Sequence, residues 1–131
     1  MFKNRIYANF PAGHHIEDYP GKCANFHGHN YAVEVRVGGT KLDELKILVD
    51  FGELKSILKT IIDELDHTDL NQLLNEKHVT AEFLAKYIYT VFRDLLKQRT
   101  QTVFLDRVRV WETDDNSSEY YDEKEVSKWM R

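Results

Sequence analysis

Cysteine, proline and glycine are all scarce in this chain of 131 residues, which has one cysteine, two prolines and six glycines. A single cysteine cannot form an internal disulfide, and it excludes a structural zinc site built from several cysteines. Residues 1–7 lack the unbroken apolar stretch and the small-residue cleavage site of a secretory signal. Together these absences predict a cytoplasmic protein.

Long apolar runs and a concentrated positive charge are also missing. No segment approaches the roughly 20 apolar residues that a membrane helix needs, so we expect no membrane partner. The formal net charge is -4 and the basic residues are scattered, whereas nucleic-acid binding needs a concentrated positive face. A nucleic-acid partner is therefore disfavoured. The length suits one domain, 1–131, with a single core.

The apolar pattern predicts two strands in the first third of the chain. Apolar residues fall on even positions in 2–10 and on odd positions in 31–37, which is the period of half-buried strands. Pro11 cannot donate to a ladder and is expected to end the first strand in a turn. The second strand is expected to break at Gly38 and Gly39. A loop between the two strands would present Cys23.

Two amphipathic helices are expected next. Asp50 offers an N-cap for a helix whose apolar residues recur at helical spacing over 51–65. Thr80 offers a second cap, for an apolar stripe that continues to Leu96. The connection between them, through Asn75, is expected to be a loop.

The last third of the chain returns to strands. Residues 102–113 are β-rich, and the alternation changes phase near Asp106, which is typical of a β-bulge. Residues 118–121 predict a short fourth strand, and 123–131 a charged helical tail. The order strand, strand, helix, helix, strand, strand predicts an α+β domain: a four-stranded antiparallel sheet with two helices on one face. The other face needs a partner if it is apolar.

The stretch 21–31 carries the clearest chemistry, because Cys23 stands four residues before a His-Gly-His. Two histidines at i and i+2 point to the same side of a strand, so His27 and His29 can reach one metal ion. A third histidine from the end of the first strand would give a catalytic zinc site with one open position. Both His14 and His15 are candidates, and the pattern does not choose between them. A simpler interpretation is a buried cysteine beside two histidines in a metal-free loop.

Part of the same stretch also fits the opening half of the cupin metal motif, through Gly21, His27, His29 and Glu34. In an unbroken strand, however, Glu34 lies on the face opposite the two histidines. The helical middle of the chain leaves too few strands for a cupin barrel, and Cys23 would have no role. The cupin interpretation is therefore the less favoured one.

Taken together, the motifs resemble those of the 6-pyruvoyltetrahydropterin synthase and 6-carboxytetrahydropterin synthase family. That family carries F-x-A-x-H, then C followed by H-G-H-x-Y, D-F, D-H-x-x-L-N and a late E-T. The matching segments in this chain are 10–14, 23–31, 50–51, 66–71 and 112–113. Each fragment is weak alone, but five in the right order span almost the whole chain.

The resemblance implies that His14 joins His27 and His29 as zinc ligands, and that the substrate is 7,8-dihydroneopterin triphosphate. It implies that Cys23 is the base for protons on the substrate side chain, while Asp66 and His67 relay them. On residue pattern alone, these last two residues also suit a polar helix end.

The resemblance also implies a site for the pterin ring. Glu112 would accept two hydrogen bonds from the amino-pyrimidine edge, although a glutamate on a strand is also an ordinary surface residue. Thr80 and Glu82 stand where the family places residues near the substrate. The family usually reads P-T-x-E-N there, whereas this chain has Val-Thr-Ala-Glu-Phe over 79–83, a departure in that part of the pocket.

The spacing of Cys23 from the His-Gly-His resembles that of the 6-carboxytetrahydropterin synthases of queuosine biosynthesis, which release acetaldehyde and triphosphate. The alternatives are a 6-pyruvoyltetrahydropterin synthase, which eliminates triphosphate, and a zinc- or pterin-binding member without catalysis. Forms that serve folate synthesis have glutamate in place of the cysteine, so Cys23 argues against them. The resemblance further implies the tunnelling fold and a homohexamer, a dimer of trimers with active sites between subunits.

Overall fold

A computed structural model describes residues 1–130 of the chain. A short 3-10 turn, η1, lies between the first two strands. The elements in chain order are β1 (Phe2–His14), η1 (Lys22–Ala24), β2 (His27–Gly39), α1 (Phe51–Leu65), α2 (Leu70–Leu74), α3 (Ala81–Arg99), β3 (Phe104–Thr113), β4 (Asn116–Tyr120) and α4 (Glu123–Ser127).

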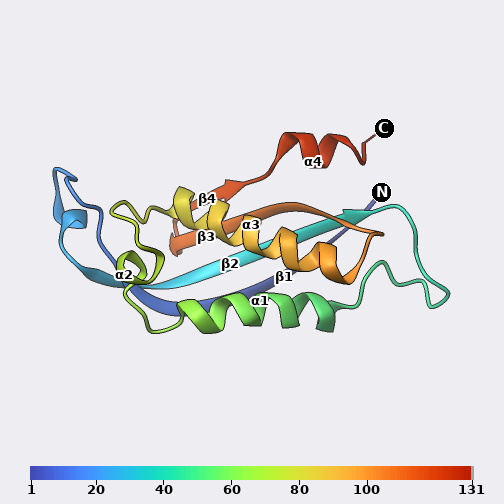
Figure 1. The fold of residues 1–131 in the computed structure, drawn as a ribbon, viewed down its shortest axis with the longest axis horizontal. Helices are drawn as coiled ribbons and strands as arrows, with labels where there is room; N and C mark the ends of the chain where they lie inside the picture. Colours follow the sequence, from blue (N-terminus) through green and yellow to red (C-terminus); the bar gives the residue numbers. More distant parts are fainter. Residues whose placement is uncertain (131) are drawn as a thin grey trace.

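The strands form one antiparallel sheet in the order β1-β2-β3-β4. Figure 1 shows the two long helices lying side by side over one face of this sheet; α1 packs on β1, and α3 packs on β3 and β4. The predicted α+β architecture is therefore confirmed. Within residues 1–130, no helix has the length and apolar character needed to cross a membrane.

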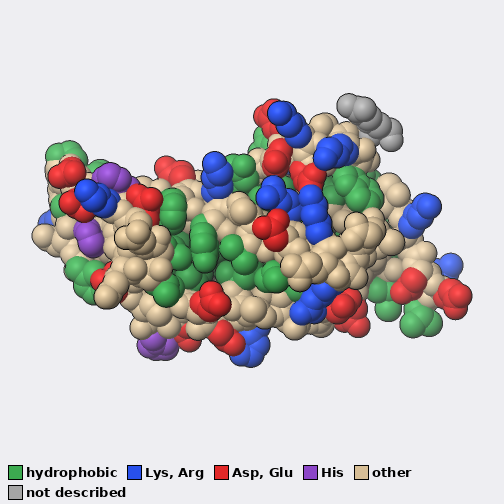
Figure 2. Space-filling model, viewed as in Figure 1, with side chains coloured by type: hydrophobic (Ala, Val, Ile, Leu, Met, Phe, Trp, Pro, Cys, Tyr) green, Lys and Arg blue, Asp and Glu red, His purple; other side chains and the backbone are tan. Residues whose placement is uncertain are grey.

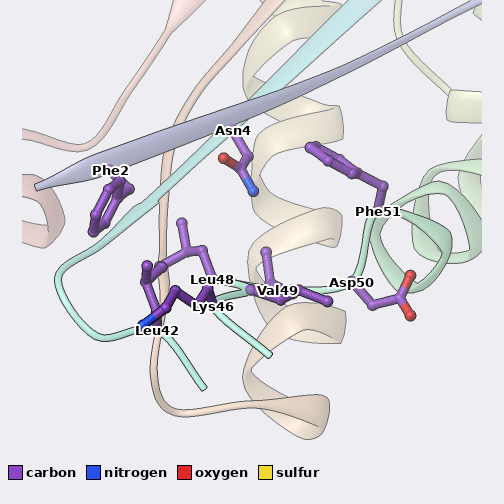
Figure 3. A pocket seen from close by; sticks show the side chains of 9 residues that line it. Phe2, Asn4, Leu42, Lys46, Leu48, Val49, Asp50 and Phe51 are labelled. Atoms are coloured by element: carbon purple, nitrogen blue, oxygen red, sulfur yellow. The ribbon is translucent and has the colours of Figure 1, made fainter. Parts of the chain in front are cut away.

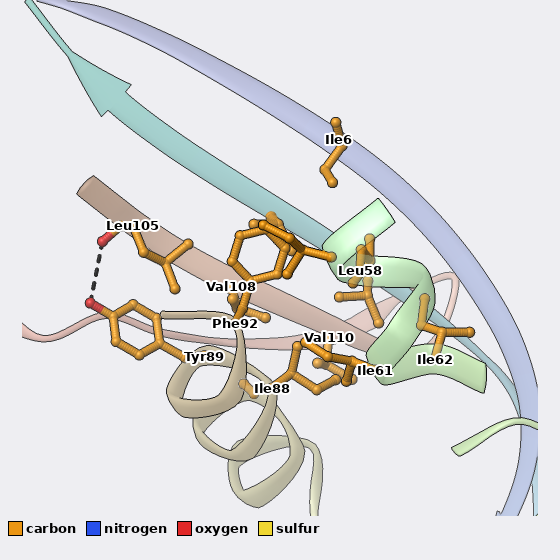
Figure 4. Packing of buried hydrophobic residues seen from close by; sticks show 14 of the residues in the cluster. Ile6, Leu58, Ile61, Ile62, Ile88, Tyr89, Phe92, Leu105, Val108 and Val110 are labelled. Atoms are coloured by element: carbon orange, nitrogen blue, oxygen red, sulfur yellow. Dashed lines mark hydrogen bonds between the residues drawn. The ribbon is translucent and has the colours of Figure 1, made fainter. Parts of the chain in front are cut away.

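The core fills the space between the sheet and the two long helices (Figure 4). Valines of the central strands, such as Val108 and Val110, face Ile61, Ile88 and Phe92 on the helices. Tyr89 is completely buried, and its hydroxyl donates a hydrogen bond of 3.2 Å to the carbonyl oxygen of Leu105. Burial of this apolar surface is the main term that holds the strands in register.

The expected helix caps are present. The Asp50 carboxylate accepts a hydrogen bond from the Gly52 N–H at the start of α1, and the Thr80 hydroxyl accepts one from the Phe83 N–H at the start of α3. The phase change at Asp106 is a bulge, because Arg36 pairs with Arg107 while Val37 pairs with Leu105. The fourth strand and a helix within the charged tail are confirmed too, although Arg131 lies outside the described residues.

The predicted end of the first strand is wrong. β1 continues through Pro11, which pairs with Asn30, and ends only at His14. β1 is an edge strand, and the Pro11 carbonyl accepts from the His67 N–H on its outer side, so the missing N–H of Pro11 removes no bond to β2. The extension places His14 opposite His27 within a paired strand instead of in a loop.

Two further expectations are corrected. Gly38 and Gly39 do not break β2 but form its end; a Cβ on Gly38 would lie 2.6 Å from the Phe104 ring, so glycine permits this close approach. The expected loop through Asn75 contains α2, capped by the Asp69 carboxylate. A five-residue helix is too short to show helical periodicity in the sequence.

The sheet face away from the helices is charged. Glu34 accepts from Arg5 at 2.7 Å and from Arg36 at 3.1 Å. Glu119 pairs with Arg107 at 2.9 Å and with Arg109 at 2.6 Å. The face also carries the exposed ring of Tyr7, which lies opposite Glu34 and packs against Trp111.

Candidate metal centre and active site

Three histidines converge where β1 ends and β2 begins. His14 pairs directly with His27 across the two strands, and His29 pairs with Ala12. One ligand nitrogen from each ring lies within 4.8 Å of the others, and the ring centroids are 4.6 to 4.9 Å apart. In Figure 2 the visible histidine side chains gather at this end of the molecule.

Hydrogen bonds on the far side of two rings set their orientation. Nδ1 of His14 lies 2.6 Å from the carbonyl oxygen of Val79, and Nδ1 of His27 lies 2.6 Å from that of Asn25. Because a carbonyl only accepts, each Nδ1 carries the proton and each Nε2 presents a lone pair. The acceptor on Val79 is a backbone atom, so no residue pattern could have revealed it.

The electrostatics of the rings suit a metal ion. His14 is 1% exposed, and the Nε2 atoms of His14 and His29 are buried without a hydrogen-bond partner. Burial lowers the pKa of both rings below the ordinary 6.5, which favours the neutral form that binds metals. Buried lone pairs normally find a partner, so three converging imidazoles with two orphaned nitrogens fit a metal ion with an open coordination position.

His15 takes no part in this cluster. It lines a different cavity, together with Glu17, Asp69 and Glu76. His14 is the last residue of β1, whereas His15 lies just beyond the strand, where its backbone bonds to Asn71.

Cys23 shares a cavity of about 430 Å³ with the three residues expected to contact substrate. Its walls include Thr80 and Glu82 from the start of α3 and Glu112 from the end of β3. A carboxylate oxygen of Glu112 lies 3.8 Å from Nε2 of His14, so this cavity adjoins the histidine cluster. A half-buried thiol, a carboxylate and a candidate metal site therefore surround one space.

Asp66 and His67 lie elsewhere. Their side chains are paired, with Nδ1 of His67 2.8 Å from an Asp66 oxygen, and the His67 side chain is 78% exposed. His67 lines a separate cavity of about 550 Å³ with His29 and Phe26. Within one chain, the structure does not bring this pair into the cavity of Cys23.

Another cavity, of about 440 Å³, lies at the end of the molecule opposite the histidines (Figure 3). Phe2, Leu48 and Phe51 line it, and none of the predicted site residues does. It plays no part in the candidate active site.

Comparison with known proteins gives consistent matches. The model of the family described as 6-pyruvoyl tetrahydropterin synthase matches residues 5–123. A 6-carboxy-5,6,7,8-tetrahydropterin synthase of Aquifex aeolicus is 35% identical over 78% of this chain and 77% of its own length. A protein of the same name from Haemophilus influenzae is 29% identical over 92% and 99%. The structure of Caenorhabditis elegans 6-pyruvoyl tetrahydropterin synthase superimposes with a TM-score of 0.79 and 25% identity, covering 93% of this chain and 96% of that one.

Proposed function

Because the chain belongs to the 6-pyruvoyl tetrahydropterin synthase family, we propose that it is a zinc-dependent 6-carboxy-5,6,7,8-tetrahydropterin synthase. The substrate would be 7,8-dihydroneopterin triphosphate, and the products 6-carboxytetrahydropterin, acetaldehyde and triphosphate. The observation that carries the proposal is the cavity in which Cys23 and Glu112 adjoin three converging histidines. Two similar proteins bear the name of this activity.

The metal ligands in this proposal are His14, His27 and His29. The orphaned Nε2 atoms of His14 and His29 support it, as does the hydrogen bond that holds His14 in its tautomer. When bound, zinc would supply Lewis-acid polarisation of substrate side-chain oxygens. The chain itself supplies the neutral imidazoles, their fixed orientation and the adjoining cavity.

Cys23 is the proposed base. The η1 turn places its thiol in the same cavity as Glu112, so a substrate anchored there can present its side-chain carbons to the sulfur. Glu112 is the proposed anchor, because a carboxylate can accept two hydrogen bonds from the amino-pyrimidine edge of a pterin. Thr80 and Glu82 are proposed as further substrate contacts from the cavity wall.

Asp66 and His67 are proposed to act on the cavity of a neighbouring subunit. The His67 side chain is exposed, and neither residue lines the cavity of Cys23 in its own chain, which suits a site completed by a second copy. A homohexamer built as a dimer of trimers would provide such a neighbour.

We also propose a role in queuosine biosynthesis in the cytoplasm, where a reducing environment keeps the single thiol free.

The second candidate is the 6-pyruvoyltetrahydropterin synthase reaction in the same site, favoured by the likeness to the C. elegans enzyme. The three-residue gap between Cys23 and His27 is our reason for preferring the carboxy product. A member that binds zinc or pterin without catalysis is the third, and the altered segment 79–83 is its only support.

The test is turnover of 7,8-dihydroneopterin triphosphate by the zinc-loaded protein, with products identified by mass spectrometry. Acetaldehyde and a carboxy product support the proposal, whereas a pyruvoyl product favours the second candidate. Cys23→Ala is expected to retain zinc, because the thiol is not a ligand, and to lose turnover by about 100-fold or more, the typical contribution of a general base. Full activity of Cys23→Ala would exclude this base, and absence of any zinc-dependent turnover in the unaltered protein would favour the non-catalytic candidate.

A further inference from the structure

One residue of the segment 66–71 has no role in the proposed reaction, yet it makes more polar contacts than its neighbours. Asn71 is 8% exposed and lies near the start of α2. Its Nδ2 lies 2.9 Å from the carbonyl oxygens of His15 and Glu76 and 3.2 Å from that of Lys77, so its two N–H groups are shared among three acceptors. Its Oδ1 accepts from the His15 N–H at 2.9 Å. The amide therefore ties two separate backbone segments together.

Both backbone segments help to hold the metal candidate His14 in place. The first contains His15, which follows His14 directly. The second runs from Glu76 towards Val79, whose carbonyl accepts the hydrogen bond from Nδ1 of His14. Asn71 thus connects the backbone that carries the ligand with the backbone that orients its ring.

Other contacts join the same two segments but do not replace the amide. The Glu17 N–H donates to the carbonyl of Lys77 at 3.0 Å, and Ile16 bridges to His78. These bonds lie beyond His15, on the side away from His14. Among the described residues 1–130, only the Asn71 side chain bonds both the N–H and the carbonyl of His15, which follows the ligand.

The chemistry of this position requires an amide. One side-chain atom must accept from an N–H while the other donates to carbonyls, and of the side chains of this size only asparagine does both. Aspartate keeps the acceptor but places an anion against three carbonyl oxygens. Alanine removes all of these bonds.

We propose that Asn71 is a positioning residue for the metal centre: it fixes the distance between His14 and the Val79 carbonyl, and so holds Nε2 of His14 towards His27 and His29. This inference rests on the proposed metal site. Residues that orient a metal ligand from behind typically change metal affinity by 10- to 100-fold when they are replaced. An amide that only stabilised the fold would lower the melting temperature without such a change.

The experiment compares Asn71→Asp and Asn71→Ala with Tyr89→Phe. The control also removes a buried hydrogen bond from a side chain to a backbone carbonyl. Its acceptor, Leu105, lies near the start of β3, whereas the candidate site adjoins the end of that strand. Dissociation constants for Zn²⁺ and Co²⁺ are measured by chelator competition, together with the visible spectrum of the Co²⁺ forms and the melting temperature of each metal-free form. We expect the Asn71 variants to lose affinity by about 10-fold or more and to shift the Co²⁺ bands. The control is expected to keep the affinity and spectrum of the unaltered protein.

Unchanged affinity and spectrum in the Asn71 variants would overturn the inference while leaving the proposed metal site intact. Loss of affinity in Tyr89→Phe to the same extent would also overturn it, by showing that any loss of stability has this effect. Absence of metal binding in the unaltered protein would overturn the proposed function and the inference with it.

A measurement on the unaltered protein covers the case in which the Asn71 variants do not fold. Thermodynamic coupling is reciprocal: if the hydrogen bonds between Asn71 and His15 strengthen metal binding, then bound metal must stabilise those hydrogen bonds. Zn²⁺ is therefore expected to slow hydrogen exchange of the His15 amide, whose bond is to Asn71. Exchange of this amide at the same rate with and without Zn²⁺ would overturn the proposal.

Discussion

The metal candidate His14 and its neighbour His15 are identical residues in adjacent positions, but their surroundings differ. The ring of His14 is buried against two other imidazoles, whereas that of His15 faces a polar cavity beside acidic residues. His14 is the last residue paired in β1 and lies in the histidine cluster, whereas His15 lies just outside the strand, so the position of the strand end decides which of them can hold a metal.

At this scale we predict that His14→Ala abolishes zinc binding at micromolar concentration while His15→Ala retains it. Removing one of three protein ligands leaves too few nitrogens for a stable site. Metal content after dialysis and calorimetric titration measure the effect, and circular dichroism checks that both variants fold. Retention of zinc by His14→Ala, or its loss in His15→Ala, would contradict the assigned ligand set.

At the scale of single elements, the bulge at Asp106 determines how the side chains of β3 are oriented. The Asp106 side chain is fully buried, and its carboxylate accepts from Lys3 at 3.1 Å and from Arg107 at 2.8 Å. Beyond the bulge, Val108 and Val110 point into the core and Glu112 reaches the candidate site. The bulge thus sets which residues of β3 face the helices.

We predict that Asp106→Asn destabilises the protein by about 1 to 3 kcal/mol, since two charged donors lose a buried charged acceptor. Urea unfolding followed by circular dichroism gives the free energy. Asp63→Asn is the control, because its pair with Lys59 is exposed and is expected to be worth well under about 1 kcal/mol. Equal losses in the free energy of unfolding for the two variants would mean that the buried ion pairs of Asp106 stabilise the fold no more than an exposed pair does.

The terminal helix α4 is held by charge and by one aromatic contact. Glu125 lies 2.6 Å from Nζ of Lys97, and the Trp129 ring stacks on Phe104 with centroids 5.2 Å apart. The hydrogen bond from Lys97, followed by the contact with Lys128, lowers the pKa of Glu125 below its ordinary 4.5. The stabilisation that this carboxylate provides is complete above about pH 4.5 and is lost as the pH falls through its lower, folded value.

We predict that α4 detaches in acid below about pH 4.5, before the core unfolds. Trp129 fluorescence, recorded in a Trp111→Phe background, is expected to shift towards that of exposed tryptophan while far-ultraviolet circular dichroism changes little. Glu125→Gln is the comparison variant, since its uncharged side chain removes the contribution of this carboxylate to the acid dependence and leaves that of Asp122, which caps α4 and lies 3.9 Å from Arg93. A Trp129 signal that follows global unfolding in both forms would contradict a separate step.

For the molecule as a whole, the single chain leaves most of both sheet edges unpaired and keeps His67 out of the cavity that Cys23 lines. Within residues 1–130, β1 is a long edge strand and β4 a short one; each pairs with one other strand, and residues 67–69 bond to the outer edge of β1 at Pro11 and Gly13. Unpaired edges favour association with further copies. The separation of His67 from the Cys23 cavity points in the same direction.

We predict that two inactive variants, Cys23→Ala and His67→Ala, regain activity when they are co-expressed or refolded together. Random assortment would place both intact residues in about one quarter of sites shared between two copies of a symmetric assembly. Light scattering coupled to gel filtration measures the assembly, for which we expect a hexamer. A monomeric mass, or a mixture that stays inactive, would rule out a site shared between subunits.

The sequence by itself determined the fold class, the two long helices, their caps and the bulge, because periodicity and cap chemistry are local properties. It also singled out Cys23 and the His-Gly-His, since a fixed spacing on a strand fixes which side chains point together. Only the tertiary structure decided the passage of β1 through Pro11, because a strand's position at the sheet edge does not show in its own residues. The structure alone also shows the hydrogen bond from His14 to Val79 and the bonds of the Asn71 amide to His15, which join residues far apart in the chain. It alone shows that His67 and Cys23 line different cavities. Such contacts depend on how the elements pack, which no local pattern contains.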